Sequence, residues 1–185
     1  MIEHCFTKLL DTASNYVHHN RNEGIDPKTI DITINDHIVS IKYYGYTCDS
    51  LECTFGKNIV AILQDIECLF WIDEKIVNYF LLRSTKFTII TQDTNKTLSY
   101  IWTHDAKNFE MKQYDDLQCT STQIIYELDF SKFDDSSLNN GYTSNYINLF
   151  WGHAVEVAIL NNITVNVNGV SLSDLSRAGS SIHKQ

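Results

Sequence analysis

Apolar residues recur every three or four positions at the start of the chain and at every second position directly after it. The first spacing predicts a helix over residues 4–18, because side chains three and four positions apart share one helix face. The apolar face of this helix comprises Ile2, Cys5, Phe6, Leu9, Leu10, Ala13, Tyr16 and Val17. The alternation runs through residues 29–35 and 38–44. It predicts two half-buried strands joined by the turn-forming Asn35-Asp36-His37.

The rest of the chain carries the same two patterns in an irregular order. Helices are expected over residues 55–69, 73–82 and 144–160, with Asp73 as the N-cap of the second. Strands are expected over residues 86–91, 97–103, 109–113, 123–130 and 164–167. Hairpins that alternate irregularly with helices favour an α+β two-layer sandwich over a doubly wound parallel sheet. Residues 1–172 are expected to form this single domain, and residues 173–185 a polar tail that frays.

The 185 residues include 23 acidic and 14 basic side chains, which gives a net charge of −9. A protein that binds nucleic acid through its phosphates usually carries a basic stripe, and this sequence contains none. Acidic residues instead gather in the second half of the chain, where we expect a solvated sheet edge and loop. They are Asp105, Glu110, Asp115, Asp116, Glu127, Asp129, Asp134 and Asp135.

Five cysteines are scattered along the chain, and the first residues have neither a basic start nor an apolar core. An odd number of scattered cysteines suits a reducing compartment, and Cys5 and Cys68 are expected in the core. The longest apolar run, residues 59–63, is too short to span a membrane. We therefore expect a soluble intracellular protein, cytoplasmic rather than nuclear. Abundant Asn, Asp, Ile, Tyr and Lys are typical of AT-rich genomes, such as those of large DNA viruses and some parasites. A viral origin and association with the virion follow as expectations.

Several simpler kinds of site find little support in the residues. His18 and His19 point about 100° apart on a helix and so rarely bind one metal ion. Cys48 and Cys53 lack the spacing of a zinc site, and no Gly-x-Ser-x-Gly motif indicates a hydrolase. Solvated surface residues are also a simpler interpretation than a basic cluster for nucleotide or DNA. That cluster would comprise Lys8, His18, His19 and Arg21.

Five segments, taken in order, resemble the ATPase domain of type IIA DNA topoisomerases, which has the GHKL, or Bergerat, fold. Residues 75–80 and 86–93 (KIVNYF and KFTIITQD) look like the family's KLANIFS and FTVETAD. Residues 95–103 (NKTLSYIWT) are similar to NTGKKYKQTWT, and residues 123–133 (QIIYELDFSKF) to TKVTFEPDLEKF. The last helix and residues 165–169 (VNVNG) resemble the helix before VKVYLNG. The resemblance covers residues 4–172 and implies a mixed, mostly antiparallel sheet with helices on one face.

The first chemical motif of that family lies on its N-terminal helix and reads Glu-x-x-x-Asn-Ala-x-Asp-Asn. The resemblance implies that the Glu activates the attacking water and that the Asn carboxamide binds Mg²⁺. In this chain Lys8 stands at the Glu position, Thr12 at the Asn position, and Asn15 and Tyr16 at the Asp-Asn pair. A lysine ammonium already carries its proton at neutral pH and cannot take one from water. Of the motif, Ala13 alone remains.

The two phosphate-binding motifs of the family are also degenerate. Asn-Asn-Gly-x-Gly-Ile-Pro becomes Tyr43-Tyr44-Gly45-Tyr46-Thr47-Cys48-Asp49, which keeps one of two glycines. The lid motif Gly-Arg-Asn-Gly-x-Gly-Ala-Lys corresponds to residues 68–75, where Trp71 and Asp73 replace two glycines and Lys75 remains. Glycine lets backbone N–H groups approach a phosphate, and a Cβ blocks that approach. The resemblance therefore implies that the ATP cradle is lost.

The expected function is a catalytically inactive GHKL-like domain, a structural or protein-interaction module that needs no cofactor and no metal. Aromatic side chains at the lost pocket either fill a vacated cavity or form a patch for a protein partner. That patch comprises Tyr43, Tyr44, Tyr46, Phe70 and Trp71. The alternative is an accessory factor in transcription, replication or packaging that contacts DNA without ATP hydrolysis, which the net charge disfavours. Because the resemblance ends before the transducer and DNA-cleaving domains, strand passage is not expected.

Overall fold

The computed structural model of the chain describes residues 2–22, 29–44, 74–92, 97–104, 107–114, 121–133, 138 and 141–172. The side chains of Tyr16, of residues 18–22 and of residues 74–78 lie outside this description. The helix expected over residues 55–69, the N-cap Asp73 and the polar tail over residues 173–185 also lie outside it.

Helix α1 (Ile2–Asn22) packs its apolar side against the rest of the domain. The predicted apolar residues whose side chains are described are all buried, namely Ile2, Cys5, Phe6, Leu9, Leu10, Ala13 and Val17. The helix begins before residue 4 and ends beyond residue 18, so both predicted limits were too narrow. The prediction ended where the apolar spacing ends, but a helix continues through polar residues when no glycine or proline interrupts it. The first such residue is Gly24.

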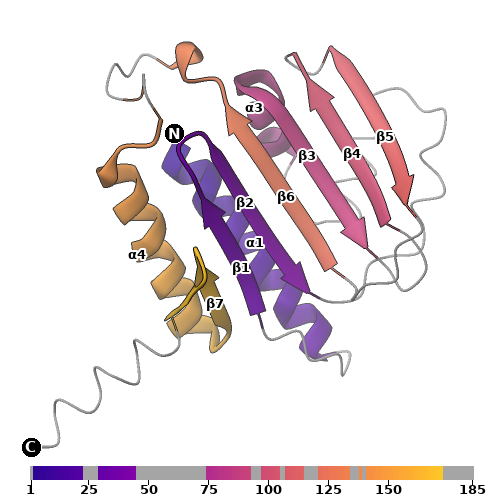
Figure 1. The fold of residues 1–185 in the computed structure, drawn as a ribbon. Coiled ribbons are helices and arrows are strands. Elements are labelled where there is room, and N and C mark those ends of the chain that lie inside the picture. The colour runs from indigo at the N-terminus through magenta and orange to yellow at the C-terminus, as the bar shows by residue number, and fades with distance from the viewer. Residues whose placement is uncertain are drawn as a thin grey trace, which may run out of the picture.

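Eight strands form one mixed sheet (Figure 1). They are β1 (Thr29–Ile34), β2 (Ile38–Tyr44), β3 (Ser84–Gln92), β4 (Thr97–Thr103), β5 (Asn108–Tyr114), β6 (Ser121–Leu128), β7 (Thr164–Val167) and β8 (Val170–Ser171). Their order across the sheet is β5-β4-β3-β6-β2-β1-β7-β8. β1 pairs with β7 in parallel, and the other described pairs are antiparallel.

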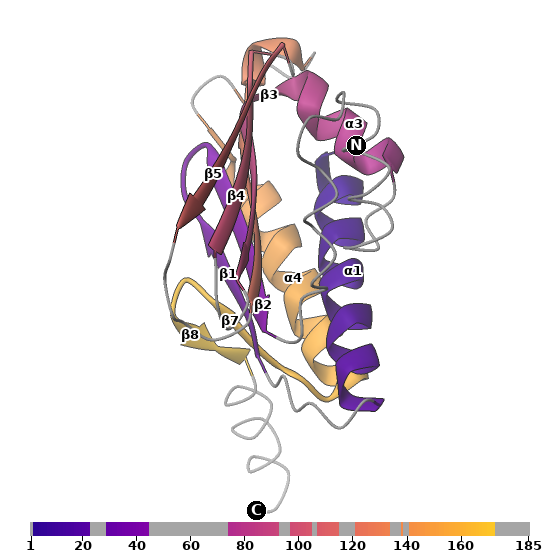
Figure 2. The ribbon, with the colours of Figure 1, turned by 90° about the vertical axis from the view of Figure 1, so that its right-hand side faces the viewer.

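Helices α1, α3 (Glu74–Arg83) and α4 (Ser144–Asn161) lie on one side of the sheet, as Figure 2 shows. Strand register explains which side they cover. Ile30 lies opposite Tyr43, and Val39 lies opposite Tyr126, so the buried residues of three neighbouring strands point to the same face. The core lies between this face and the helices. The predicted α+β two-layer sandwich, with a mostly antiparallel sheet, is therefore confirmed.

For the predicted elements that the structure describes, the limits agree to within two residues, apart from the C-terminal end of α1. Strand β8 was not predicted. One assignment at the end of β6 was wrong, because Phe130 lies in the 3₁₀ helix η2 (Phe130–Lys132) rather than in the strand. The Asp129 side chain accepts a hydrogen bond from the Ser131 backbone N–H at 3.1 Å and so starts that helix. Leu128 and Phe130 are both buried, which preserves the alternation that suggested a longer strand.

The C-terminal part of the chain anchors the end of the first strand and the turn that follows it. The backbone N–H of Tyr142 donates to the Asp36 carbonyl at 2.9 Å. The preceding Gly141 has a φ of 114°, and a Cβ there would lie 2.5 Å from the Asp36 carbonyl oxygen. The side-chain oxygen of Asn168 accepts from the Ile34 N–H at 2.8 Å, and its amide nitrogen donates to the Ile34 carbonyl at 3.2 Å. These contacts fix the β1–β2 hairpin against segments far away in sequence.

Helix α4 packs beside α1 and presents apolar residues on both its inner and its outer side. Phe150 is fully buried, and its ring stacks on that of Phe6 with 4.2 Å between ring centroids and 18° between ring planes. On the outer side, Leu149, Ile159 and Leu160 are 46%, 61% and 75% exposed. The outer side of α4 is thus more apolar than that of a typical surface helix.

Candidate functional site

Three of the four positions that the resemblance assigns to catalysis have described side chains, and they form a stripe on α1. Lys8, Thr12 and Asn15 are spaced by four and three residues, so they share one side of the helix. Lys8 and Asn15 are exposed and Thr12 is half-buried. The Thr12 hydroxyl donates to the Lys8 carbonyl at 2.8 Å, which is a local helix contact. The side chain of Tyr16 lies outside the described residues.

The sheet face beneath the helices carries buried hydroxyl groups at one end. Tyr43, Thr122 and Thr91 are register partners across β2, β6 and β3, and all three are almost fully buried. Among the residues that the structure describes, the hydroxyls of Thr122 and of Ser14 on α1 have no hydrogen-bond partner. Buried hydroxyls usually have one. Sequence reasoning missed this polar row, although a threonine at an inward position of an alternating strand was the available signal.

Tyr43 and Tyr44 point to opposite faces of the sheet. Tyr43 is fully buried on the helix side, whereas the Tyr44 hydroxyl donates to an Asp31 carboxylate oxygen at 3.0 Å on the other side. The Asn166 amide donates to the second Asp31 oxygen at 2.7 Å, and the Lys42 ammonium lies 5.1 Å from the Tyr44 ring centroid. The two tyrosines therefore lie on opposite faces of the sheet, because neighbouring residues of a strand alternate in direction.

The side chains of the other residues in the two phosphate-binding motifs are not described by the structure. Gly45, Tyr46, Thr47, Phe70, Trp71 and Asp73 lie outside the described residues, as does the side chain of Lys75. The backbone of Lys75 belongs to α3. The roles expected for these residues, including a partner patch of Tyr46, Phe70 and Trp71, therefore stay predictions.

Buried tyrosines and one thiol lie where α1, α3 and α4 meet the sheet. Tyr126 and Tyr142 are both buried, and this burial raises the pKa of both hydroxyls well above the usual value. Burial also raises the pKa of Tyr79 to about 12 and that of Cys5 to about 11. The expectation that Cys5 is a core residue is confirmed. A thiol that stays protonated is a poor nucleophile, so this cluster is structural.

The described residues offer few groups for a metal. Within this part of the chain no set of three or more His, Cys, Asp or Glu side chains is arranged to hold an ion. His153 of α4 lies 3.4 Å from Asp11 of α1 and 3.4 Å from Glu156, which links the two helices. The His18 and His19 side chains, and Cys48 and Cys53, lie outside the description. Among the described helices, none is both long and apolar enough to cross a bilayer.

The sheet order and the one-sided helical layer match the fold of solved type II topoisomerase ATPase regions. Over 92% of its length the chain is similar to a crystal structure of the ATPase and transducer domains of DNA topoisomerase II from Balamuthia mandrillaris, with a TM-score of 0.73 and 18% sequence identity. Two structures of the ATPase region of Saccharomyces cerevisiae topoisomerase II also match over 92% of the chain at 16% identity. Their TM-scores are 0.69 and, for the one bound to ICRF-187 (dexrazoxane), 0.66.

These similarities concern the fold. The chain spans about half of each matched topoisomerase chain, 48% in all three cases. Its sequence matches no protein-family model and no curated protein. The resemblance inferred from five short segments is therefore confirmed at the level of architecture.

Proposed function

We propose that the chain is a GHKL-like domain without ATP hydrolysis that serves as a structural or protein-interaction module. The observation that carries the proposal is the stripe of Lys8, Thr12 and Asn15 on α1. These side chains occupy the positions that the resemblance assigns to the catalytic carboxylate, the Mg²⁺ ligand and the polar pair that follows. The scaffold is kept while the groups that act on a nucleotide are replaced.

The fold family implies ATP and Mg²⁺, and the described residues do not fit them. Lys8 is an exposed cation where a proton acceptor is needed, and general-base catalysis contributes roughly 10²–10⁴ in rate. The hydroxyl of Thr12 already donates to the Lys8 carbonyl at 2.8 Å. Proteins usually hold Mg²⁺ through one or two carboxylates together with substrate phosphates and water, and this stripe offers no carboxylate.

Thermal unfolding with a non-hydrolysable ATP analogue and Mg²⁺ tests the proposal. A ligand at a hundred times its dissociation constant adds about 2.7 kcal/mol to the free energy of unfolding. For a domain of this size that would raise Tm by roughly 5–10 °C. We expect the Mg²⁺-dependent change in Tm to be within about 1 °C, and we expect no Mg²⁺-dependent release of phosphate from ATP.

The ATPase region of Saccharomyces cerevisiae topoisomerase II serves as the positive control, because the same assay must detect its nucleotide. Two results would overturn the proposal. One is a Mg²⁺-dependent rise of several degrees in this chain. The other is ATP turnover that the Lys8→Ala variant abolishes, since that would give Lys8 a catalytic role.

The interaction role is supported by the outer side of α4. Ile159 and Leu160 are neighbouring, large, apolar and exposed, and Leu149 is exposed ten residues earlier on the same helix. Exposed apolar residues that form a patch are typical of protein contacts. The double variant Ile159→Glu and Leu160→Glu should fold normally. It should no longer bind a purified partner protein that the purified wild-type chain binds. The variant Asn148→Glu on the same exposed side should keep that partner. Equal binding by all three proteins would remove α4 as the interaction surface.

A further inference from the structure

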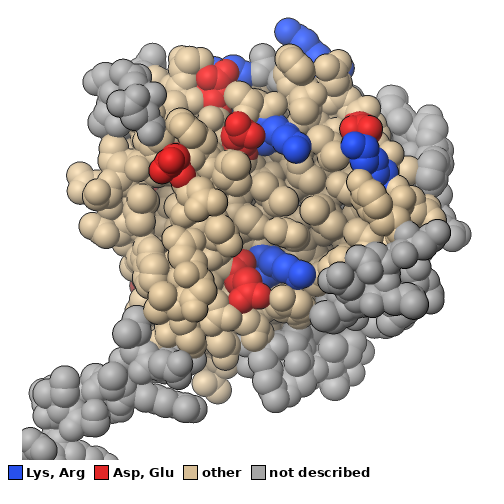
Figure 3. Space-filling view, in the orientation of Figure 1, with Lys and Arg blue, Asp and Glu red and all other residues tan. Residues whose placement is uncertain are grey.

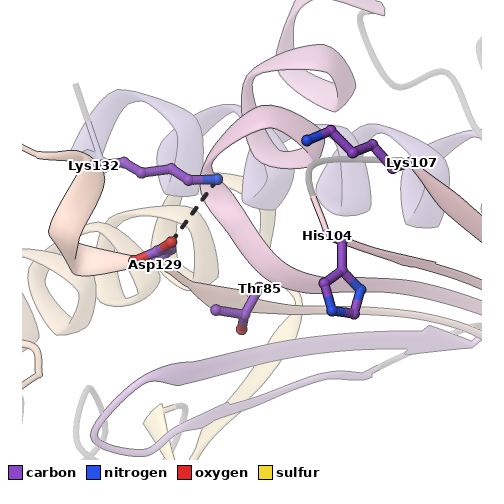
Figure 4. A pocket seen from close by; sticks show the side chains of 5 residues that line it. All are labelled: Thr85, His104, Lys107, Asp129 and Lys132. Carbon is purple, nitrogen blue, oxygen red and sulfur yellow. Dashed lines mark ion pairs between the residues drawn. The ribbon is translucent and has the colours of Figure 1, made fainter.

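A small pocket lies at one end of the sheet. It has a volume of about 340 Å³ and is lined by Thr85, His104, Lys107, Asp129 and Lys132. Thr85 belongs to the start of β3, His104 follows β4, and Asp129 follows β6, so the ends of three neighbouring strands meet there. Figure 4 shows the five side chains around one space. The volume is at the lower end of the range for small-ligand sites, about 300–1,000 Å³.

Two local irregularities of the backbone build this pocket. The register between β3 and β6 shifts between Ser84 and Lys86, which makes Thr85 the extra residue of a β-bulge. His104 has a φ of 54° and begins a tight turn in which the Lys107 N–H donates to the His104 carbonyl at 3.1 Å. Bulges redirect side chains and occur often beside functional sites. Positive φ values are uncommon in residues other than glycine.

Positive charge dominates the pocket. The Lys132 ammonium donates to the Leu82 carbonyl at 3.0 Å and lies 3.8 Å from an Asp129 carboxylate oxygen. The same carboxylate also accepts hydrogen bonds from the backbone and hydroxyl of Ser131. Among the described residues, Lys107 has no ion pair. In Figure 4 the two lysine side chains extend toward one another across the pocket from opposite sides. Like charges that face each other are stabilised by an anion between them.

We propose that this pocket binds a phosphate group, with Lys107 and Lys132 as the cationic ligands and the His104 ring as a hydrogen-bonding group. The Thr85 hydroxyl donates to the Glu127 carbonyl at 3.2 Å and so lines the pocket without donating to the ligand. Lysines act as point charges and are common phosphate ligands, whereas a carboxylate is more often held by the planar fork of an arginine. No arginine is among the described residues that line the pocket. The His104 ring is held by a 3.2 Å contact between its Nδ1 and the Asn108 amide nitrogen, which leaves Nε2 for a ligand. This proposal is independent of the loss of ATP hydrolysis.

The phosphate can belong to a free ion, to a mononucleotide or to a nucleic-acid backbone. The net charge of −9 opposes a long polyanion. On the face shown in Figure 3, the described lysines lie scattered among acidic residues and form no broad basic area. A single phosphate on a small molecule therefore fits the pocket best. Asp105, between His104 and Lys107 in sequence, lies outside the described residues.

Heteronuclear NMR titration of the full chain tests the proposal at constant ionic strength. The ligands are inorganic phosphate, a nucleoside 5′-monophosphate and a short single-stranded oligonucleotide, each without Mg²⁺. We expect saturable shifts of the Thr85, His104 and Lys107 amides with phosphate and with the monophosphate. Lys107→Ala should weaken binding by roughly tenfold or more, since a charge-assisted hydrogen bond is lost. Lys107 is exposed, so this variant should fold like the wild type.

Lys112→Ala is the matched control, because it removes the same charge from an exposed position on β5 outside the pocket. It should leave the affinity for phosphate unchanged. Tighter binding of the oligonucleotide, with the same loss in Lys107→Ala, would identify the phosphate as that of a nucleic acid. The proposal is overturned if millimolar phosphate gives no saturable shift, or if Lys112→Ala weakens binding as much as Lys107→Ala does. Repeating the ATP-analogue experiment in Lys107→Ala separates the two proposals, since a rise in Tm due to this pocket disappears in that variant.

Discussion

Gly141→Ala should destabilise the domain strongly, because the added methyl group has no room. The Cβ would lie 2.5 Å from the Asp36 carbonyl oxygen, a backbone atom that cannot turn aside like a flexible side chain. The φ of 114° at this position is also one that alanine rarely adopts. A residue other than glycine that is held in such a backbone conformation destabilises the folded state by about 1–3 kcal/mol. Moving the backbone apart would further weaken the 2.9 Å hydrogen bond from Tyr142 to Asp36, worth about 0.5–1.5 kcal/mol.

We therefore expect Gly141→Ala to lower the free energy of unfolding by about 2–4 kcal/mol. For a domain of this size the decrease in Tm would be roughly 4–16 °C. Urea denaturation followed by far-ultraviolet circular dichroism measures the first value, and a thermal scan measures the second. The transition should stay cooperative with an unchanged dependence on urea, because the contact joins parts of one core.

Gly152→Ala provides the matched control, since the same methyl group is added in the middle of α4. Apart from the adjoining residues and backbone of the helix itself, no heavy atom lies within 4 Å of the new Cβ, and the residue is exposed. Alanine is the better helix former, so this variant should be more stable by about 0.5–1 kcal/mol. If Gly141→Ala unfolds at the same urea concentration as the wild type, the steric reasoning is refuted. The turn and the start of α4 would then be able to separate without loss.

Three further predictions concern the core. Phe150→Ala should cost about 3–5 kcal/mol in urea denaturation, because it removes a fully buried ring stacked at 4.2 Å, whereas Leu160→Ala on the exposed side should change stability by less than about 0.5 kcal/mol. Burial raises the pKa of Cys5 to about 11, so this thiol should not react rapidly with a thiol reagent at pH 8 in the native protein. The native Cys5→Ser variant should therefore show as many rapidly reacting thiols as the wild type. One fewer in the variant would contradict the burial of Cys5. Burial also raises the pKa of Tyr79 from 10.0 to about 12, so the unfolded chain releases this proton first and the free energy of unfolding should fall as the pH rises from 10 to 12. Tyr79→Phe should show a shallower decrease over that range, and an equal decrease in both proteins would show that other groups cause it.

Local patterns in the sequence were sufficient to predict most of the elements. In β1, residues Ile30, Ile32 and Ile34 are all buried, as their alternation with polar residues requires. The pattern reports which face is apolar and not where an element ends, which explains the extra residues of α1 and the misplaced Phe130. Strand order has no such local signal. The parallel pairing of Ile30 with Val165 joins residues far apart in sequence, and no short window contains both.

The candidate site was less accessible to sequence reasoning. Matching a motif letter by letter places Tyr43 and Tyr44 together, although the alternation of the strand already implies opposite directions. The phosphate pocket could not have been found this way, because a β-bulge at Thr85 and a left-handed turn at His104 bring its residues together. No glycine or proline in the sequence indicates either irregularity.

The late pairing of β1 has a consequence for how the protein is made. Asn168, which hydrogen-bonds to Ile34, lies 134 residues further along the chain. β7, which directly precedes Asn168 in sequence, pairs with the outer edge of β1. At about 5–20 residues per second, a ribosome needs roughly 7–27 s to add that length. Throughout this interval the N-terminal hairpin has an unpaired edge rich in isoleucine, a template for wrong strand pairing. Nascent-chain protection, for example by a chaperone that recognises extended apolar segments, would thus act earliest on the first 45 residues.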